Sequence, residues 1–400
     1  MRIVHVSDCY LPRLGGIEMQ VEDLARRQIE AGHEVTVLTS TAGGPPTDGG
    51  ADCAHQPALV RVAGSNRGGI EQIVYRATRR GARELTSTLG DYDLVHVHAS
   101  SFSPLAFLCA HHAARRGTPT VATVHSLWAK ATPLFLAADR LTGWGKWPVA
   151  WSAVSNAAAA ALRDIAESGA PVTILANGIE PGDWDVLHDG GAQGVLRIAA
   201  VSRLARRKRV LQLVEILQAA HDRLSPGFHL DASILGEGPQ RRDIERHLRR
   251  HDMESWVKLP GRATRTQIRD VFAHTDLFVA PASLESFGIA ALEARCAGLP
   301  VLARAGTGVE DFVAHGREGW LVPSDAAMVD MIVALADAPD LLSRVSEHNR
   351  TVPARISWKV VLEECEDLYE QAAARHGRAW ARAGTAGPAI GSRVAEGKKG

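Results

Sequence analysis

Two glutamates flank a short apolar run in the second half of the chain, ESFGIAALE, where Glu285 and Glu293 stand eight positions apart. If a helix begins within residues 287–289, Glu285 precedes its N-terminus and Glu293 lies inside it. A helix N-terminus favours an anion, and eight residues of helix would span about 12 Å. A diphosphate there would have a carboxylate on each side, one for sugar hydroxyls and one for ribose hydroxyls. A nucleotide sugar has this layout.

A group of cations suits the same ligand. The stretch VSRLARRKRV places Arg203 just past a predicted strand and Lys208 at the start of the next helix. Two fixed cations can neutralise a diphosphate without a metal. They would also stabilise the charge that grows on a departing nucleoside diphosphate while the anomeric carbon becomes oxocarbenium-like. The neighbouring arginines are expected to be solvated: Arg206, Arg207 and Arg209.

Alternating strands and helices would position these groups. Short β-branched or apolar segments separated by helical patterns indicate parallel, doubly wound sheets. The predicted strands are 2–8, 34–40, 58–63, 93–99, 118–125, 150–155, 172–177, 195–202, 229–236, 256–261, 277–282 and 300–305. The predicted helices are 17–32, 70–90, 103–116, 156–168, 208–224, 239–251, 264–274, 288–297 and 357–375. Ligands bind at the carboxyl ends of such strands, where glycines let backbone N–H groups approach a phosphate.

The pattern breaks once, near residue 180, in a stretch rich in Gly, Pro and Asp. The interpretation is two α/β domains, residues 1–180 and 195–356, joined by a linker at 181–194. Residues 357–375 are predicted to form a terminal helix that crosses back to the first domain. Residues 376–400, rich in Gly, Ala and basic side chains, are predicted to be a disordered tail.

Composition excludes several classes of protein. Lys+Arg and Asp+Glu are both 45, so the zero net charge argues against a nucleic-acid partner. The five cysteines are odd in number and widely spaced, which favours a reduced cytoplasmic chain over a disulfide or zinc protein. No apolar run reaches the roughly 18 residues of a membrane helix, and Asp8 interrupts any export signal.

Taken in order, the motifs GG after the first strand, VSRL with Lys208, LGEGP and ESFGIAALEA resemble the family-4 glycosyltransferases of the GT-B fold. The resemblance covers about residues 1–372 and implies a retaining enzyme that uses a nucleotide sugar without a metal or other cofactor. The implied catalytic residues are Glu285, His125, Arg203 and Lys208. The implied donor-binding residues are Gly15, Gly16, Gly236, Arg262, Phe287, Gly288, Ile289 and Glu293.

Each of these residues also has a structural interpretation. The two glutamates could be a helix cap and a surface charge, and Gly15-Gly16 could be only a loop. His125 could be a hydrogen-bonded core histidine. His96 and His98 alternate along a predicted strand, and a structural role is at least as compatible with that placement as a role at the site.

Four functions remain open at this stage. The first is transfer of a sugar from a UDP- or GDP-linked donor to a hydroxyl acceptor. A non-catalytic sugar-nucleotide-binding protein would not turn over the donor. A sugar-nucleotide epimerase would form product without an acceptor. A nicotinamide-dependent oxidoreductase needs a G-x-G-x-x-G motif after a first strand, and the sequence lacks one.

The acceptor is the least constrained partner: a sugar, a small molecule or a lipid-linked molecule. Residues 126–151 carry four of the nine tryptophans together with Lys130, Arg140 and Lys146. Tryptophan beside lysine suits a membrane interface, and the arginines of 75–89 could add attraction to anionic lipid. The alternative is that the tryptophans pack in the core or stack on a soluble acceptor. The expected location is the cytoplasm, with peripheral contact at the inner membrane face under the first interpretation.

Overall fold

The structure is a computed structural model that describes residues 1–13, 15–43, 56–62, 89–128, 132–165, 171–191 and 194–382. The predicted helix 70–90 and the arginines of 75–88 fall outside these residues, apart from positions 89 and 90. The chain forms two compact units, each described by itself. The first comprises residues 1–122, 146–150 and 365–400, and the second comprises residues 123–145 and 151–364.

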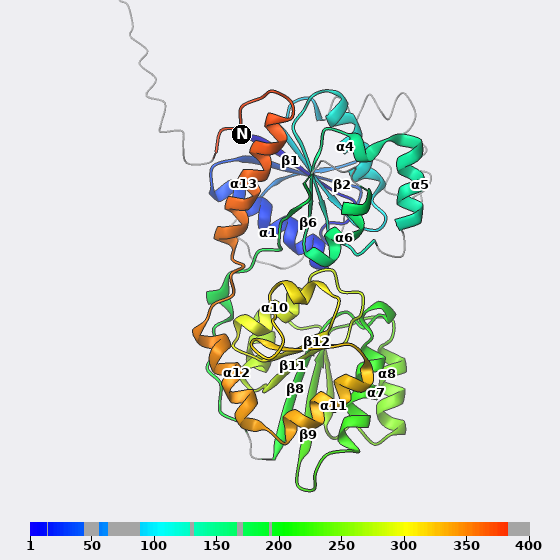
Figure 1. The fold of residues 1–400 in the computed structure, drawn as a ribbon, viewed down its shortest axis with the longest axis vertical. Helices are drawn as coiled ribbons and strands as arrows, with labels where there is room; N and C mark the ends of the chain where they lie inside the picture. Colours follow the sequence, from blue (N-terminus) through cyan, green and yellow to red (C-terminus); the bar gives the residue numbers. More distant parts are fainter. Residues whose placement is uncertain are drawn as a thin grey trace, which may run out of the picture. The chain divides into compact units, whose positions relative to one another are not determined.

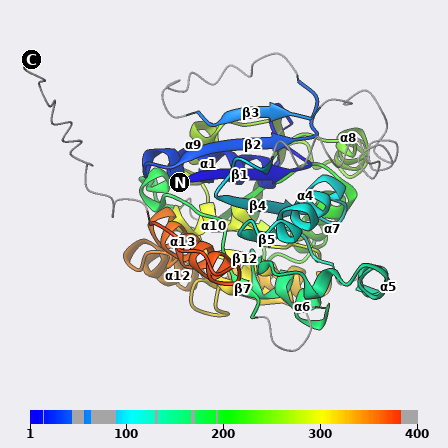
Figure 2. The ribbon, with the colours of Figure 1, turned by 90° about the horizontal axis from the view of Figure 1, so that it is seen from above.

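The first sheet is parallel, in the strand order β3-β2-β1-β4-β5-β6-β7 (Figure 2). All seven strands predicted for this half are present: β1 Arg2–Ser7, β2 Glu34–Thr39, β3 Ala58–Arg61, β4 Leu94–Ala99, β5 Thr120–Val124, β6 Ala150–Ala153 and β7 Thr173–Ile174. The described helices are α1 Gly16–Glu30, α4 Pro104–Arg115, α5 Thr132–Thr142 and α6 Asn156–Ile165. Strand β4 is buried along its whole length, as expected for a strand covered on both faces.

The second sheet is also parallel and has the order β10-β9-β8-β11-β12-β13 (Figure 1). Its strands are β8 Val195–Val201, β9 His229–Leu235, β10 Val257–Gly261, β11 Leu277–Ala280, β12 Val301–Arg304 and β13 Gly319–Val322. Its helices are α7 Val210–His221, α8 Arg241–Arg250, α9 Arg265–Ala273, α10 Ile289–Cys296, α11 Asp325–Ala336 and α12 Pro339–Thr351. The prediction of two doubly wound α/β halves is therefore confirmed, although α5, β13, α11 and α12 were not predicted.

A buried apolar core joins the second sheet to its helices. Ile198 of β8, Leu213 of α7 and Ile332 of α11 are buried in one continuous apolar cluster. Within β8, the cluster members Leu196, Ile198 and Ala200 alternate along the chain, which is the two-residue period of a strand. This packing holds the loops that leave the carboxyl ends of the strands.

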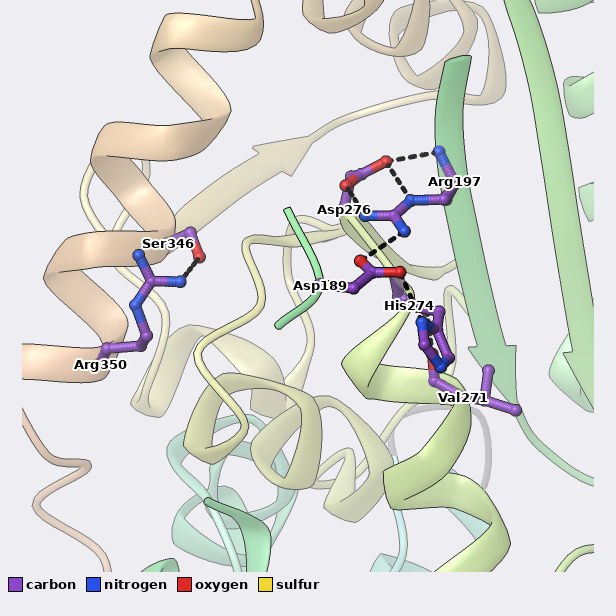
Figure 3. A network of polar contacts seen from close by, with 8 residues as sticks. Asp189, Arg197, Val271, His274, Asp276, Ser346 and Arg350 are labelled. Carbon is purple, nitrogen blue, oxygen red and sulfur yellow. Dashed lines mark hydrogen bonds and ion pairs between the residues drawn. The ribbon is translucent and has the colours of Figure 1, made fainter. Parts of the chain in front are cut away.

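The predicted linker is more ordered than its composition suggested. Residues Pro181–Trp184 form a short 3-10 helix, and Trp184 is buried. Asp189 accepts hydrogen bonds from Arg197 at 2.7 Å and from His274 Nδ1 at 2.6 Å (Figure 3). Arg197 also donates three hydrogen bonds to Asp276, one from its backbone N–H at 2.8 Å and two from its guanidinium group at 3.1 and 2.7 Å. These contacts hold the linker against the amino ends of β8 and β11, opposite the ligand edge.

The terminal helix α13, Trp358–Ala374, lies beside α1 in the first unit over its last part (Figure 1). Tyr369 accepts a hydrogen bond from Gln28 of α1 at 2.8 Å. Within the predicted tail, Trp380 stacks on His33 and donates to Glu366 at 2.6 Å. The rest of the predicted tail lies outside the described residues. None of the described helices is both long enough and apolar enough to cross a membrane.

Candidate donor-binding and active site

The strand order of the second sheet contains a topological switch point at β8. Strand β8 lies between β9 and β11, so the chain leaves β8 toward one side and later returns to add β11 on the other. Loops that follow two such strands diverge, and ligands of open α/β sheets bind at this point. Lys208 follows β8 and Glu285 follows β11. The two loops singled out from the sequence therefore meet at the switch point.

The structure brings Lys208 and Glu285 into direct contact. The Nζ of Lys208 lies 2.5 Å from Oε2 of Glu285, and the side chains are 34% and 16% exposed. Lys208 ends a short 3-10 helix, Arg206–Lys208, and Arg209 then takes a left-handed conformation with φ 58°. This turn presents Lys208 to the edge of the sheet. A half-buried pair of this kind can exchange partners with a ligand that carries both an anion and hydroxyl groups.

Helix α10 begins at Ile289, inside the predicted range. Gly288 precedes it with φ 93°, where an added Cβ would lie 2.8 Å from Val309 Cγ2. The first N–H groups of the helix have no intrahelical partner and suit an anion. Phe287 is 2% exposed and packs on Phe312, so only its backbone can meet a donor. The length of about 12 Å assumed eight helical residues between Glu285 and Glu293. Residues 285–288 are not helical, so this length does not describe the separation of the two glutamates.

Gly236 is required by a close approach of two loops. Its φ is 136°, and an added Cβ would lie 1.9 Å from the carbonyl oxygen of Ser202, beside Arg203. Gly308 is similar, because an added Cβ would lie 2.1 Å from the carbonyl oxygen of Ser286. Its N–H donates to the carbonyl oxygen of Glu285 at 2.9 Å. Both glycines therefore fix the loops that carry the charged residues, and Gly308 was not selected from the sequence.

Gly236→Ala is expected to weaken donor binding and lower the melting temperature. The matched control is Gly227→Ala, where φ is 91° but nothing lies within 4 Å of an added Cβ. The control incurs only the left-handed strain of about 1–2 kcal/mol. Calorimetric titration with nucleoside diphosphates and thermal melting compare the two. Equal losses in both variants would mean that the contact with Ser202 has no effect.

The predicted cations differ in their surroundings. Arg203 and Arg262 are exposed at the edge of the second sheet. Arg209 was expected to be solvated, and that prediction was wrong. Its Nη2 lies 2.5 Å from Oδ2 of Asp325, whose other oxygen accepts from Arg304 at 3.0 Å. Sequence reasoning missed Asp325, because neither β13 nor α11, which Asp325 begins, had been predicted. Arg304 ends β12, a predicted strand, but was not selected as a site residue.

His125 and Gly15-Gly16 belong to the carboxyl edge of the first sheet. His125 directly follows β5 and is 8% exposed. Burial lowers the pKa of His125 to about 4, so its imidazole is neutral at physiological pH. Gly15 has extended backbone and precedes α1. A Cβ on Gly15 would lie 2.5 Å from Oε2 of Glu18, the end of a flexible side chain that can move aside.

The tryptophans of 126–151 are mostly in the interior. Trp128, Trp144 and Trp151 are 1%, 3% and 1% exposed, and they form an aromatic cluster with Phe135. The interpretation as a membrane interface is wrong for these three residues, because buried rings cannot reach lipid headgroups. Trp147 is half-buried and packs on a histidine of α4. Membrane contact by other residues stays a prediction.

Comparison with known proteins supplies the class. A model of Glycosyltransferase Family 4 matches residues 14–183, and a model of Glycosyl transferases group 1 matches residues 192–352. The chain belongs to the family-4 glycosyltransferases and has the GT-B fold, as the sequence motifs predicted. It is a glycosyltransferase.

Individual relatives are distant but cover most of the chain. The chain is 25% identical to "D-inositol 3-phosphate glycosyltransferase 2" of Catenulispora acidiphila, covering 92% of this chain and 93% of the relative. It is 25% identical over 409 residues to "Glycogen synthase" of Mycobacterium tuberculosis, covering 92% and 94%. The structure of Anabaena HepE in complex with UDP and glucose matches with a TM-score of 0.68 at 16% identity, covering 88% and 94%. Sucrose-phosphate synthase from Thermosynechococcus elongatus matches with a TM-score of 0.70 at 19% identity, covering 92% and 98%.

Proposed function

We propose that the enzyme transfers a sugar, with retention of configuration, from a UDP- or GDP-linked donor to a hydroxyl acceptor. The observation that carries the proposal is the Lys208–Glu285 pair at the switch point of the second sheet. A nucleoside diphosphate presents an anion for the cation, and the sugar beside it presents hydroxyls for the carboxylate. HepE, which shares the fold, has been solved with UDP and with UDP-glucose, and this supports including uridine donors among the candidates.

Donor binding would exchange the partners of the pair. The diphosphate would take Lys208, with exposed Arg203 beside it and the N-terminus of α10 beneath it. Glu285 would then be released to accept hydrogen bonds from the donor sugar. In the transfer step the bond between the anomeric carbon and the phosphate oxygen breaks and a bond to the acceptor oxygen forms. The acceptor proton leaves with the nucleoside diphosphate, whose new charge Lys208 stabilises.

Glu293 of α10 is assigned to the ribose and neutral His125 to the neighbourhood of the sugar, as the family resemblance implies. A neutral imidazole can accept or donate one hydrogen bond without placing a second positive charge beside an oxocarbenium-like carbon. Gly15, Gly16, Gly236 and Arg262 complete the proposed donor contacts.

A thermal-shift panel followed by turnover assays tests the function. UDP, GDP, ADP and their sugar conjugates are added to the purified protein, and conjugates that raise the melting temperature are assayed with and without acceptors. Acceptor-dependent release of the nucleoside diphosphate, with the anomeric configuration of the product read by NMR, is the expected result. Binding without turnover would indicate a sugar-nucleotide-binding protein, and product without an acceptor would indicate an epimerase.

Activity is expected to survive brief treatment with a metal chelator. Lys208 and Arg203 supply the positive charge that a divalent ion would otherwise bring to the diphosphate. Initial rates are compared in excess chelator and after addition of magnesium or manganese. A rate that disappears in chelator and returns with either ion would overturn the phosphate assignment.

A further inference from the structure

Three buried histidines, none of them assigned to the donor, face one another in the first sheet. His5 lies on β1, and His96 and His98 lie on β4. The strands pair with His5 beside His96 and Ser7 beside His98, so the three side chains emerge on one face. They are 0%, 0% and 3% exposed, and one ring nitrogen of each lies within 4.8 Å of the others.

Hydrogen bonds from two helices orient this cluster. Gln28 of α1 donates through Nε2 to Tyr369, so its Oε1 accepts from His5 Nε2 at 2.6 Å. That bond leaves His5 Nδ1 with its lone pair, 2.9 Å from Nε2 of His98. The hydroxyl oxygen of Tyr369 in α13 lies 2.9 Å from Nδ1 of His96. In the tautomer in which Nδ1–H donates to this oxygen, the lone pair of the His96 ring is on Nε2.

We propose that His5, His96 and His98 form a binding site for one late divalent transition-metal ion, with zinc as the expected occupant. Three neutral imidazoles are a ligand set that zinc accepts, with Zn–N distances of about 2.0–2.1 Å. Metal-ligating histidines usually hold their second nitrogen in a hydrogen bond, and Gln28 and Tyr369 provide two such partners.

Metal binding requires a local rearrangement that the cluster permits. The rings of His96 and His98 stack with centroids 4.3 Å apart and 27° between their planes, so one ring must rotate to share an ion. The proton of His98 Nε2 moves to Nδ1 when that nitrogen becomes a ligand, without net change of charge. Because His96 is also bonded to Tyr369, the ion would fix the last part of α13 to the first sheet.

Metal content and spectroscopy of the full-length, tag-free protein test the site. The protein is stripped of metal by a chelator during unfolding and refolding, and then titrated with Zn²⁺ or Co²⁺. We expect one ion per chain, visible d–d bands of four-coordinate Co²⁺, and a higher melting temperature with Zn²⁺. His98→Gln is expected to lose all three signals, while His229→Gln, which removes an exposed histidine of β9, keeps them.

Two outcomes would overturn the site. One is a wild-type protein that refolds but takes up no ion and shows no Co²⁺ bands. The other is a His98→Gln or His5→Gln variant that is folded by circular dichroism and still binds one ion. Magnesium and manganese prefer oxygen ligands. A rise in melting temperature with zinc but not with magnesium or manganese therefore indicates binding at the histidine cluster and not at the donor diphosphate.

Discussion

Lys208→Met is expected to lower kcat/KM by about 10²–10³-fold, the usual effect of removing one fixed group that stabilises transition-state charge. Methionine keeps the length of the side chain and removes the charge. Lys208 is only 34% exposed and touches Glu285 at 2.5 Å, so water replaces the ammonium group poorly. The loss should fall mainly on kcat, because charge on the leaving diphosphate grows in the transition state. Initial rates over a range of donor concentrations measure both constants.

Arg207→Met is the matched control for Lys208→Met. Arg207 lies one residue away, carries the same charge and is exposed. We expect a change in kcat/KM of about fivefold or less, since exposed charges contribute about 0–1 kcal/mol. If both substitutions reduce the rate equally, the effect belongs to the general charge of the loop and Lys208 has no specific role.

The fold was predictable where local pattern and burial agree. Strand β4 reads LVHVHA and is buried on both faces, and helix α7 reads VLQLVEIL with apolar residues at helical spacing. Strand β13, Gly319–Val322, is four residues long and begins with glycine, so it gave no clear strand signal. Because β13 was not predicted, α11, which follows it and carries Asp325 in its first turn, was not predicted either. Only the sheet as a whole shows why that helix begins at the ligand edge.

Residue types predicted the charges of the site but not their partners. The spacing of Glu285 from the cations could not show that it pairs with Lys208, because the two loops lie 77 residues apart in sequence. Arg209 was expected to be solvated but pairs with Asp325. For the tryptophans of 126–151, a membrane interface and packing in the core were both left open, and three of the four are buried. The alternation of His96 and His98 was visible in the sequence. Their contact with His5 depends on the pairing of β1 with β4.

Glu285→Ala and Glu293→Ala are expected to separate turnover from donor binding. Glu285 is 16% exposed beside Lys208, next to the position of the reacting sugar. Loss of its charge-assisted hydrogen bonds costs about 1.5–3 kcal/mol, or roughly 10- to 150-fold in kcat. Glu293 lies within α10, at the position assigned to the ribose. Its loss should raise the donor Kd by a similar factor and leave kcat within a few-fold of the wild type.

The comparison needs two binding measurements, because Glu285→Ala also frees Lys208. Calorimetric titration with the nucleoside diphosphate alone should show unchanged or tighter binding to Glu285→Ala, since the ammonium group no longer has a competing carboxylate. The same titration should show weaker binding to Glu293→Ala, which loses a ribose contact. Glu363→Ala removes an exposed carboxylate and serves as the control. If nucleoside diphosphate affinity falls in Glu285→Ala and stays constant in Glu293→Ala, the two carboxylates have been assigned to the wrong ends of the donor.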